Sequence, residues 1–172
     1  VCDRTDARLV QHDASDESQL THVDADASGG RDAWPLLPAT INRRLHEADR
    51  IVTVGTVEPH QYAGFSGGAK GIAIDCGGEP TISAMHGLEF LRDPRTRLGV
   101  ADDNPFQSAL WELIDWTDAP LGLQLVPPTP DSSTVVVGGP LRSTFERAVE
   151  TARNRFFDPF DQTYDWLVLD VP

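Results

Sequence analysis

The chain has a single lysine, and it stands in a glycine-rich stretch where a ligand could be held. Residues 64–71 read GFSGGAKG, and Lys70 is the only lysine beside thirteen arginines. We interpret an amine kept where lysine is otherwise replaced as a functional group. Gly67 and Gly68 let backbone approach a ligand closely, and successive amides there can form an anion-binding nest. A flexible surface loop is the alternative interpretation.

Two familiar lysine motifs do not fit this stretch. A phosphate-binding P-loop needs glycine before the lysine and serine or threonine after it, but Ala69 and Gly71 stand there. A serine-lysine nucleophile pair needs serine three positions before the lysine, where Gly67 stands, and Ser66 is one position too far. Neither motif explains the loop.

Two histidines stand on either side of Lys70 in the sequence. His60 follows a β-branched run, and an imidazole there, with a pKa near neutrality, can act as a general base toward a bound substrate. His86 lies on the inward-looking face of a predicted helix, one turn from Ile82 and one from Phe90. As isolated residues both are more often structural, His60 as a hydrogen bonder and His86 as a satisfied core histidine.

Helical and strand-like segments alternate along the chain, which determines the expected fold. This alternation predicts an α/β fold with a doubly wound, largely parallel sheet flanked by helices. Ligands of such folds gather beyond the carboxyl ends of the strands, and His60 and the glycine-rich stretch follow such an end. Apolar residues at helical spacing predict helices over 39–49, 80–93, 104–116 and 142–156. Apolar or β-branched runs predict strands over 50–59, 96–102, 121–127, 133–140 and 165–171.

The length of the chain favours one domain over residues 1–172. Within it, residues 12–34 are acidic and rich in Ser, Gly and Asp, which predicts an exposed loop or excursion. The two cysteines give no disulfide framework, and no stretch has the length and apolarity of a signal peptide or membrane span. We therefore expect a cytoplasmic protein.

The charge of the chain excludes some classes of partner. Asp and Glu number 27 against 14 Lys and Arg, for a formal net charge of -13. A polyanion is repelled by such a surface, so neither nucleic acid nor an anionic membrane is an expected partner. We interpret the spread acidity and the scarcity of lysine as a halophilic-type acidic surface, with a high-GC genome as the alternative reason for the missing lysines.

The stretch VEPHQYAGFSGGAKGIAIDCGGEPTISAMHG, residues 57–87, resembles the lactate racemase family, whose members use a nickel-pincer nucleotide. The resemblance rests on His60, on Lys70 ten residues later and on His86 sixteen beyond that, within the motif EPHxxAGFSGG. A weaker resemblance runs from about Leu9 to the end. It implies a fold like the racemase N-terminal domain and an isomerase, a racemase or epimerase of a small 2-hydroxy acid.

The resemblance also implies a cofactor site. Lys70 would be joined through a thioamide to pyridinium-3,5-bisthiocarboxylic acid mononucleotide carrying nickel, and an arginine guanidinium cannot supply the acylatable amine that this link needs. Ser66, Gly67 and Gly68 would contact the cofactor. His86 would be the protein ligand on nickel, completing a square-planar site with one carbon and two sulfur donors of the cofactor.

His60 would be one of two histidines that exchange a proton with the substrate hydroxyl. In the family reaction the C2 hydride passes transiently to the cofactor while the base takes the hydroxyl proton, and return of the hydride to the other face inverts the centre. A neutral imidazole takes the proton and an imidazolium returns it, so this chemistry favours a pKa near the working pH.

The chain departs from the family pattern in two ways. Members commonly have arginine where Ala69 stands and Pro-Gly where Ile74 and Asp75 stand, so the substrate need not be lactate. The family's second acid/base histidine and its substrate-carboxylate arginine precede the matching region, and a second domain follows it. We therefore expect a central fragment, inactive alone, whose partners are the missing N-terminal segment and C-terminal domain of its parent protein.

A second hypothesis belongs to a different class of protein. In it, the chain is a non-catalytic acidic α/β module that binds a small anion or a nucleotide through the glycine-rich loop. Phosphate or nucleotide binding that is unaffected by His60→Ala and His86→Ala would favour this module, whereas convergence of His60, Lys70 and His86 on one pocket would favour the racemase.

Overall fold

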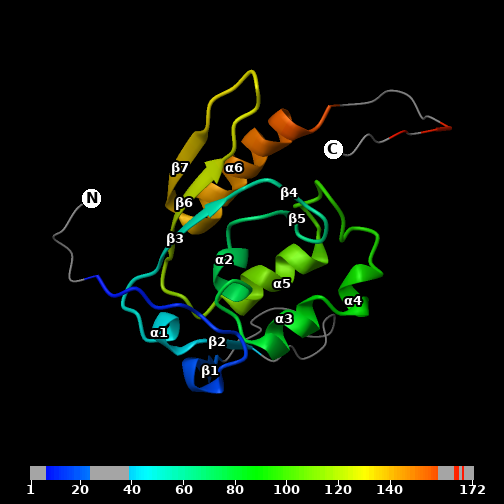
Figure 1. Cartoon of the computed structure of the whole chain (residues 1–172). Helices are drawn as coiled ribbons and strands as arrows, with labels where there is room; N and C mark the ends of the chain where they lie inside the picture. Colours follow the sequence, from blue (N-terminus) through cyan, green and yellow to red (C-terminus); the bar gives the residue numbers. More distant parts are fainter. Residues whose placement is uncertain (1–6, 24–38, 159–164, 167, 169–172) are drawn as a thin grey trace.

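The computed structural model describes residues 7–23, 39–158, 165–166 and 168 (Figure 1). Its helices are the short 3-10 turn η1 (Glu17–Gln19), α1 (Arg43–His46), α2 (Lys70–Ala73), α3 (Glu79–Met85), α4 (Leu88–Leu91), α5 (Pro105–Leu113) and α6 (Leu141–Phe156). Its strands are β1 (Leu20–His22), β2 (Thr40–Asn42), β3 (Val52–Thr56), β4 (Pro59–His60), β5 (Gly64–Phe65), β6 (Leu121–Val126) and β7 (Val135–Pro140). Helices and strands alternate, so the predicted α/β class with flanking helices is confirmed.

The main sheet has the strand order β3-β6-β7. β3 runs parallel to β6, with Val52 opposite Leu121, whereas β6 and β7 are antiparallel, with Val126 opposite Val135. The described sheet is therefore mixed, which corrects our expectation of a largely parallel one. Residues 127–134, which join β6 to β7, are too few for a crossover helix, which needs about a dozen residues, but suffice for a hairpin.

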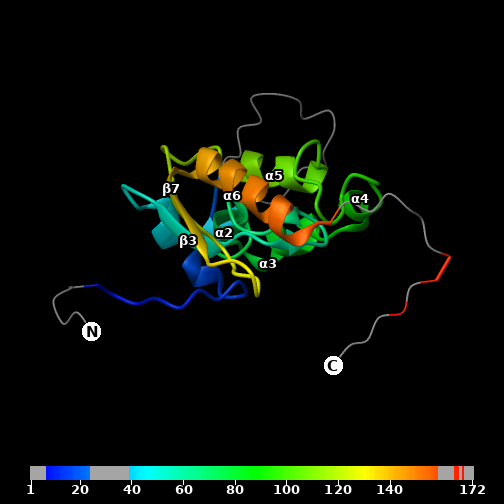
Figure 2. The same cartoon turned by 90° about the horizontal axis from the view of Figure 1, so that it is seen from above.

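Helix α6 covers one face of this sheet (Figures 1 and 2). Its apolar stripe packs on inward-facing sheet residues, and this core contains Val57, Phe65, Val126, Val137, Phe145, Ala148, Val149 and Ala152. The opposite face of the sheet carries exposed apolar side chains, namely Val52, Val54, Leu121, Leu123 and Val136. The alternation of the strands thus places one set of side chains under α6 and the other set at the surface.

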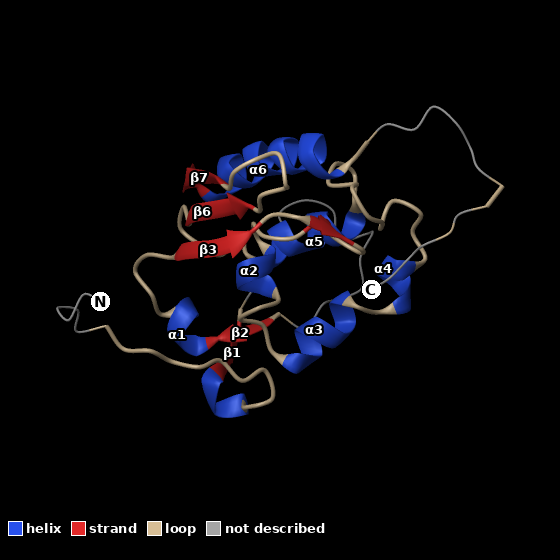
Figure 3. Cartoon of the chain, turned by 45° about the horizontal axis from the view of Figure 1, so that its top comes forward, coloured by secondary structure: helices blue, strands red, loops and turns tan. Residues whose placement is uncertain are grey.

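A second core lies beyond the edge of β3, where α2 stands beside that strand (Figure 3). It gathers side chains from β2 and from helices α2 to α5, among them Ile41, Ile72, Met85, Phe90, Phe106 and Leu110. Asn104 caps α5 as its sequence position predicts, since its side chain accepts the backbone N–H groups of Phe106 and Gln107. The candidate site lies between the two cores.

The segment predicted as one helix over 80–93 is two helices, α3 and α4, separated at Gly87. Gly87 has extended backbone, with φ -70 and ψ 160, and caps α4. His86 consequently follows the last residue of α3 as its C-cap and is not in the middle of a helix.

Other predicted elements also differ. Within 39–49, residues Thr40–Asn42 form strand β2, which pairs with β1, and only Arg43–His46 are helical. Within the acidic segment 12–34, the described part contains η1 and β1, so it is not wholly a loop, and 24–34 lie outside the described residues. No strand forms over 96–102, and most of 165–171 lies outside the described residues. In the described part of the chain, no helix is long and apolar enough to span a membrane.

Candidate functional site

An open cavity of about 600 Å³ lies between β3 and the glycine-rich loop. β3 pairs on one side with β6, and from its carboxyl end the chain continues into β4, which ends at His60. The cavity is lined by five of the six predicted site residues, His60, Ser66, Gly67, Gly68 and Lys70, together with Glu58, Asp75, Cys76, Gln124 and residues of β3. The sixth, His86, lies outside this lining.

Two glycines give the loop its shape. Gly67 and Gly68 have φ of +82° and +58°, a left-handed conformation that favours glycine. A Cβ at Gly67 would lie 2.6 Å from Gln124 Oε1, and one at Gly68 would lie 2.6 Å from a ring carbon of Phe145. The loop backbone therefore packs directly on β6 and α6, and glycine is required at both positions.

The backbone amides of the loop are largely used within the protein. The Ser66 amide donates to Glu58 O, the Lys70 amide to Gly67 O and the Gly71 amide to Gly68 O. The Gly68 amide donates to Gln124 Oε1 at 2.9 Å. These groups are not free to cradle an anion, so the predicted nest is not formed in this conformation.

The Ser66 hydroxyl is also taken up by backbone. It donates to Thr56 O at 2.9 Å and accepts the Glu58 amide at 3.1 Å. Ser66 thus ties the start of the loop to the end of β3. Its side chain both holds the loop by hydrogen bonds and lines the cavity.

Lys70 is the first residue of α2, and its amine is held close to the protein. The side chain is 17% exposed, and Nζ lies 3.4 Å from Asp75 Oδ1. Asp75 is itself largely exposed, so this is a partly solvated ion pair of modest strength. The amine is therefore oriented at the cavity, within reach of a ligand that enters it.

His60 is fixed by the turn that follows it. Its Nδ1 lies 3.2 Å from the backbone N of Tyr62 and 3.2 Å from that of Ala63. Backbone N–H groups can only donate, so Nδ1 accepts, and the neutral ring carries its proton on Nε2. The pKa of His60 is lowered from its ordinary value of 6.5, first by burial and then by the charges of Lys70 and His86, while Asp75 opposes this shift.

His86 has the reverse arrangement. Its Nδ1 lies 2.7 Å from the carbonyl oxygen of Ile82 in the last turn of α3. A carbonyl can only accept, so Nδ1 carries the proton and Nε2 keeps a lone pair in the neutral ring. Histidines that ligate metals commonly donate their other ring N–H to a carbonyl in this way.

Tyr62 lies between the two histidines. Its ring centroid is 6.1 Å from that of His60 and 5.7 Å from that of His86, both in edge-on contact. Phe106 supports the same group, with its ring 5.5 Å from His86. His60 and Lys70 thus share the cavity, and His86 belongs to the same neighbourhood across one aromatic ring. Among the described residues, no three His, Cys, Asp or Glu side chains group as a metal site.

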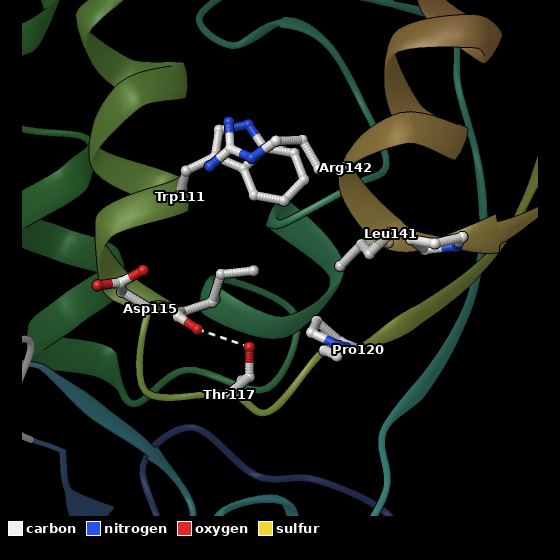
Figure 4. A pocket seen from close by; sticks show the side chains of 9 residues that line it. Trp111, Asp115, Thr117, Pro120, Leu141 and Arg142 are labelled. Carbon is white, nitrogen blue, oxygen red and sulfur yellow. Dashed lines mark hydrogen bonds between the residues drawn. The ribbon is translucent and has the colours of Figure 1, made fainter.

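A smaller cavity of about 280 Å³ lies elsewhere, where α5 meets the start of α6. In it the Arg142 guanidinium lies over the ring of Trp111, 4.2 Å from the centroid (Figure 4). The Thr117 hydroxyl donates to Ile114 O at 2.7 Å in the same wall. None of the predicted site residues lines this cavity, and its contacts join the two helices.

Comparison with known proteins identifies the family. Residues 1–99, more than half of the chain, match the family described as the lactate racemase N-terminal domain. The chain belongs to this family. Its relatives include a lactate racemase of Thermoanaerobacterium thermosaccharolyticum, 36% identical over 98 residues, and one of Lactiplantibacillus plantarum, 34% identical over 91 residues. These alignments cover 57% and 53% of this chain but only 21% and 20% of the relatives.

Solved structures agree with membership of the lactate racemase N-terminal domain family. The lactate racemase apoprotein of T. thermosaccharolyticum superposes with a TM-score of 0.71 at 25% identity, covering 86% of this chain and 34% of that one. A Thermotoga maritima protein shares the fold, with a TM-score of 0.53 at 22% identity, covering 67% of this chain and 29% of that one. The chain spans about a fifth of the length of the curated relatives it matches.

Lys70 and His86 are residues of the kind that the cofactor implied by the family resemblance requires, although His86 lies outside the lining of the cavity. A nickel ligand must present a free imidazole nitrogen, and Nε2 of His86 is such a nitrogen. Attachment of a cofactor requires an amine next to a space that can hold the cofactor. Lys70 lines the cavity of about 600 Å³. Gly67 and Gly68, which precede Lys70, have no side chains that would fill this space.

Sequence reasoning did not select Gln124 or Tyr62. Tyr62 stands two residues after His60, where nothing in the sequence shows that it separates two histidines. Gln124 had a usable signal, because it is the one polar side chain in the strand LGLQLV, at a position that alternation turns inward. A buried amide in such a strand must find hydrogen-bond partners, and Gln124 finds them in the loop.

Proposed function

We propose that this chain is part of a nickel-pincer nucleotide-dependent racemase or epimerase of a small 2-hydroxy acid, working in the cytoplasm. The observation that carries the proposal is that the only lysine and His60 line one cavity, and that the oppositely bonded His86 lies one aromatic ring away from His60. Membership of the lactate racemase N-terminal domain family supports it. The departures at Ala69, Ile74 and Asp75 leave lactate as one substrate among several 2-hydroxy acids.

Lys70 and His86 would hold the cofactor. The Lys70 amine, oriented by Asp75, would form the thioamide, and Nε2 of His86 would ligate nickel. Ser66, Gly67 and Gly68 would shape the wall against which the cofactor lies. When bound, the cofactor supplies the reversible hydride acceptor for C2 of the substrate.

His60 would exchange the proton of the substrate hydroxyl. Its lowered pKa keeps the ring neutral near pH 7, which is the form that a base requires. In this structure, however, the neutral ring has its proton on Nε2, because Nδ1 accepts two backbone amides. Accepting a proton at Nε2 requires the ring proton to move to Nδ1, so the contacts with the Tyr62 and Ala63 amides must open. Both contacts are long for hydrogen bonds, at 3.2 Å, which makes this opening feasible.

The rest of a racemase-length polypeptide would complete the reaction. The second acid/base histidine, the arginine for the substrate carboxylate and the second domain belong to parts of the family protein that this chain does not match. A hydroxyl proton taken on one face must be returned on the other, so one imidazole alone does not support racemisation. We therefore expect the chain by itself to be inactive.

The test uses the fact that Lys70 is the only lysine. The chain is coexpressed with enzymes that make the nickel-pincer nucleotide, and its intact mass and nickel content are measured. We expect a mass adduct that maps to Lys70 with about one nickel per chain. Lys70→Arg should abolish the adduct, His86→Ala should lose nickel but keep the adduct, and His22→Ala, at an exposed histidine of β1, should change neither. An unmodified Lys70 in the wild-type chain would contradict the proposal.

A further inference from the structure

Gln124 is a buried amide in an otherwise apolar strand. It lies on β6, is 1% exposed and faces α6 with Gly122 and Val126. A buried side-chain amide without partners is costly, typically about 1–3 kcal/mol for each unsatisfied group. The partners that Gln124 has found therefore indicate what it does.

The partners of Gln124 lie on two different elements. Its Oε1 accepts the Gly68 amide at 2.9 Å in a buried hydrogen bond, and its Nε2 lies 3.4 Å from Thr53 Oγ1 on β3. The loop rests on this amide so closely that a Cβ at Gly67 would lie 2.6 Å from Oε1. Gln124 thus connects strands β3 and β6 of the sheet to the turn at Gly67 and Gly68.

The turn held by Gln124 is the one that starts α2. The Lys70 amide donates to Gly67 O and the Gly71 amide to Gly68 O, so the first turn of α2 is built on the two glycines. Lys70 is the first residue of that helix. Any shift of Gly68 away from β6 therefore moves the backbone of Lys70.

We propose that Gln124 is a positioning residue that fixes the Lys70 amine in the cavity by anchoring the Gly67–Gly68 turn to β6. The role in a reaction rests on the proposed function, in which Lys70 carries the cofactor. An amine that must react with one group of a bound cofactor reacts more readily when its backbone is held within about 0.5 Å of the productive position. Ser66 ties the loop to β3, and Gln124 ties it to β6.

The only lysine gives a direct readout of this anchor. The folded chain is treated with an N-hydroxysuccinimide acetate, and the rate of acetylation at Lys70 is followed by mass spectrometry of its peptide, which separates it from the terminal amine. In Gln124→Leu the turn loses its buried hydrogen bond, so Lys70 should be acetylated about tenfold faster. Gln124→Glu keeps an acceptor for the Gly68 amide and should stay near the wild-type rate.

Gln107→Leu is the matched control. Gln107 is also a buried glutamine, it lies on α5 outside the cavity lining, and both polar atoms of its side chain lack partners among the described residues. Its replacement should leave the Lys70 rate unchanged. Equal rates in Gln124→Leu and wild type, or equal acceleration by Gln107→Leu, would overturn the proposal.

Hydrogen exchange tests the same anchor without any variant. In the wild-type chain the Gly68 amide should exchange at least about tenfold more slowly than the Glu47 amide, because its hydrogen bond is buried, whereas Glu47 is an exposed residue whose amide donates to Arg43 O at the end of the short helix α1. Rapid exchange at Gly68 contradicts the anchor even when Gln124→Leu does not fold. Neither readout involves nickel or cofactor, so the anchor and the racemase proposal can fail separately.

Discussion

The two histidines of the candidate site are held in opposite ways. On the loop side, Nδ1 of His60 accepts the amides of Tyr62 and Ala63, and the neutral ring has its proton on Nε2. On the helix side, Nδ1 of His86 donates to Ile82 O, and Nε2 keeps its lone pair. The backbone that each ring meets therefore decides whether its outer nitrogen donates or accepts. Of these two rings, only His86 has its outer nitrogen as an acceptor in this structure.

The two sides also differ in what supports them. The loop side depends on left-handed glycines, on hydrogen bonds of the Ser66 hydroxyl with Thr56 and Glu58, and on the bond that Gln124 accepts from Gly68. The helix side depends on aromatic packing, with Phe106 fully buried against His86 and Phe90. A change in loop geometry should therefore act on one histidine and leave the other in place.

The largest expected effect comes from breaking the loop side alone. Gly67→Ala puts a Cβ at φ +82°, within 2.9 Å of Gln124, Val57 and Thr56 atoms, and should lower the free energy of unfolding by about 2 kcal/mol or more. Gly71→Ala is its control, since Gly71 is helical with nothing within 4 Å of the added Cβ, and it should gain about 0.5–1 kcal/mol. Urea unfolding measures both. Equal stabilities of the two variants would show that the loop is not constrained as described.

A smaller effect is expected from the pH dependence of stability. Well above pH 6.5 the His60 ring is neutral in the folded and unfolded chain and contributes no pH dependence. As the pH falls below its ordinary pKa of 6.5, the unfolded chain binds the proton first, because the folded pKa is lowered. Stability is therefore lost as the pH falls, until the folded pKa is passed.

The measurement compares wild type with His60→Gln between about pH 7.5 and about pH 5.5 by urea unfolding. The wild type should lose more stability over this interval than the variant does. An identical pH dependence of stability in both chains would contradict a lowered pKa of His60 in the folded chain.

The smallest effect is a difference in the tautomers of the two histidines, which involves no change in stability. Long-range ¹⁵N correlation spectra of the imidazole rings at about pH 7.5 should show the proton on Nε2 in His60 and on Nδ1 in His86. His12 is an internal reference, because its Nε2 lies 2.9 Å from Gly77 O and must donate. If His60 and His86 gave the same tautomer, the distinction between the two sides would be lost.

Part of the fold could be predicted from the sequence. Periodicity predicted α6, and the Asn104–Pro105 pair predicted the start of α5, because caps and apolar stripes are local signals. The strand at β7 was predicted, but its antiparallel direction was missed, although the sequence shows that the connection 127–134 is short. The break at Gly87 was missed because the apolar spacing continues across it into α4.

The sequence by itself determined which groups are present for chemistry, namely one amine at Lys70, two imidazoles at family spacing and glycines before the amine. Composition and local pattern carry that information because side-chain type and chain-neighbour geometry are local. Only the tertiary structure decided which nitrogen of each ring is free and which residue holds the loop. Those depend on a carbonyl at the end of α3, on amides of a turn and on Gln124, which is 56 residues from the Gly68 amide it accepts. A hydrogen bond is decided by atoms meeting within about 3 Å, and the sequence does not record which distant atoms meet.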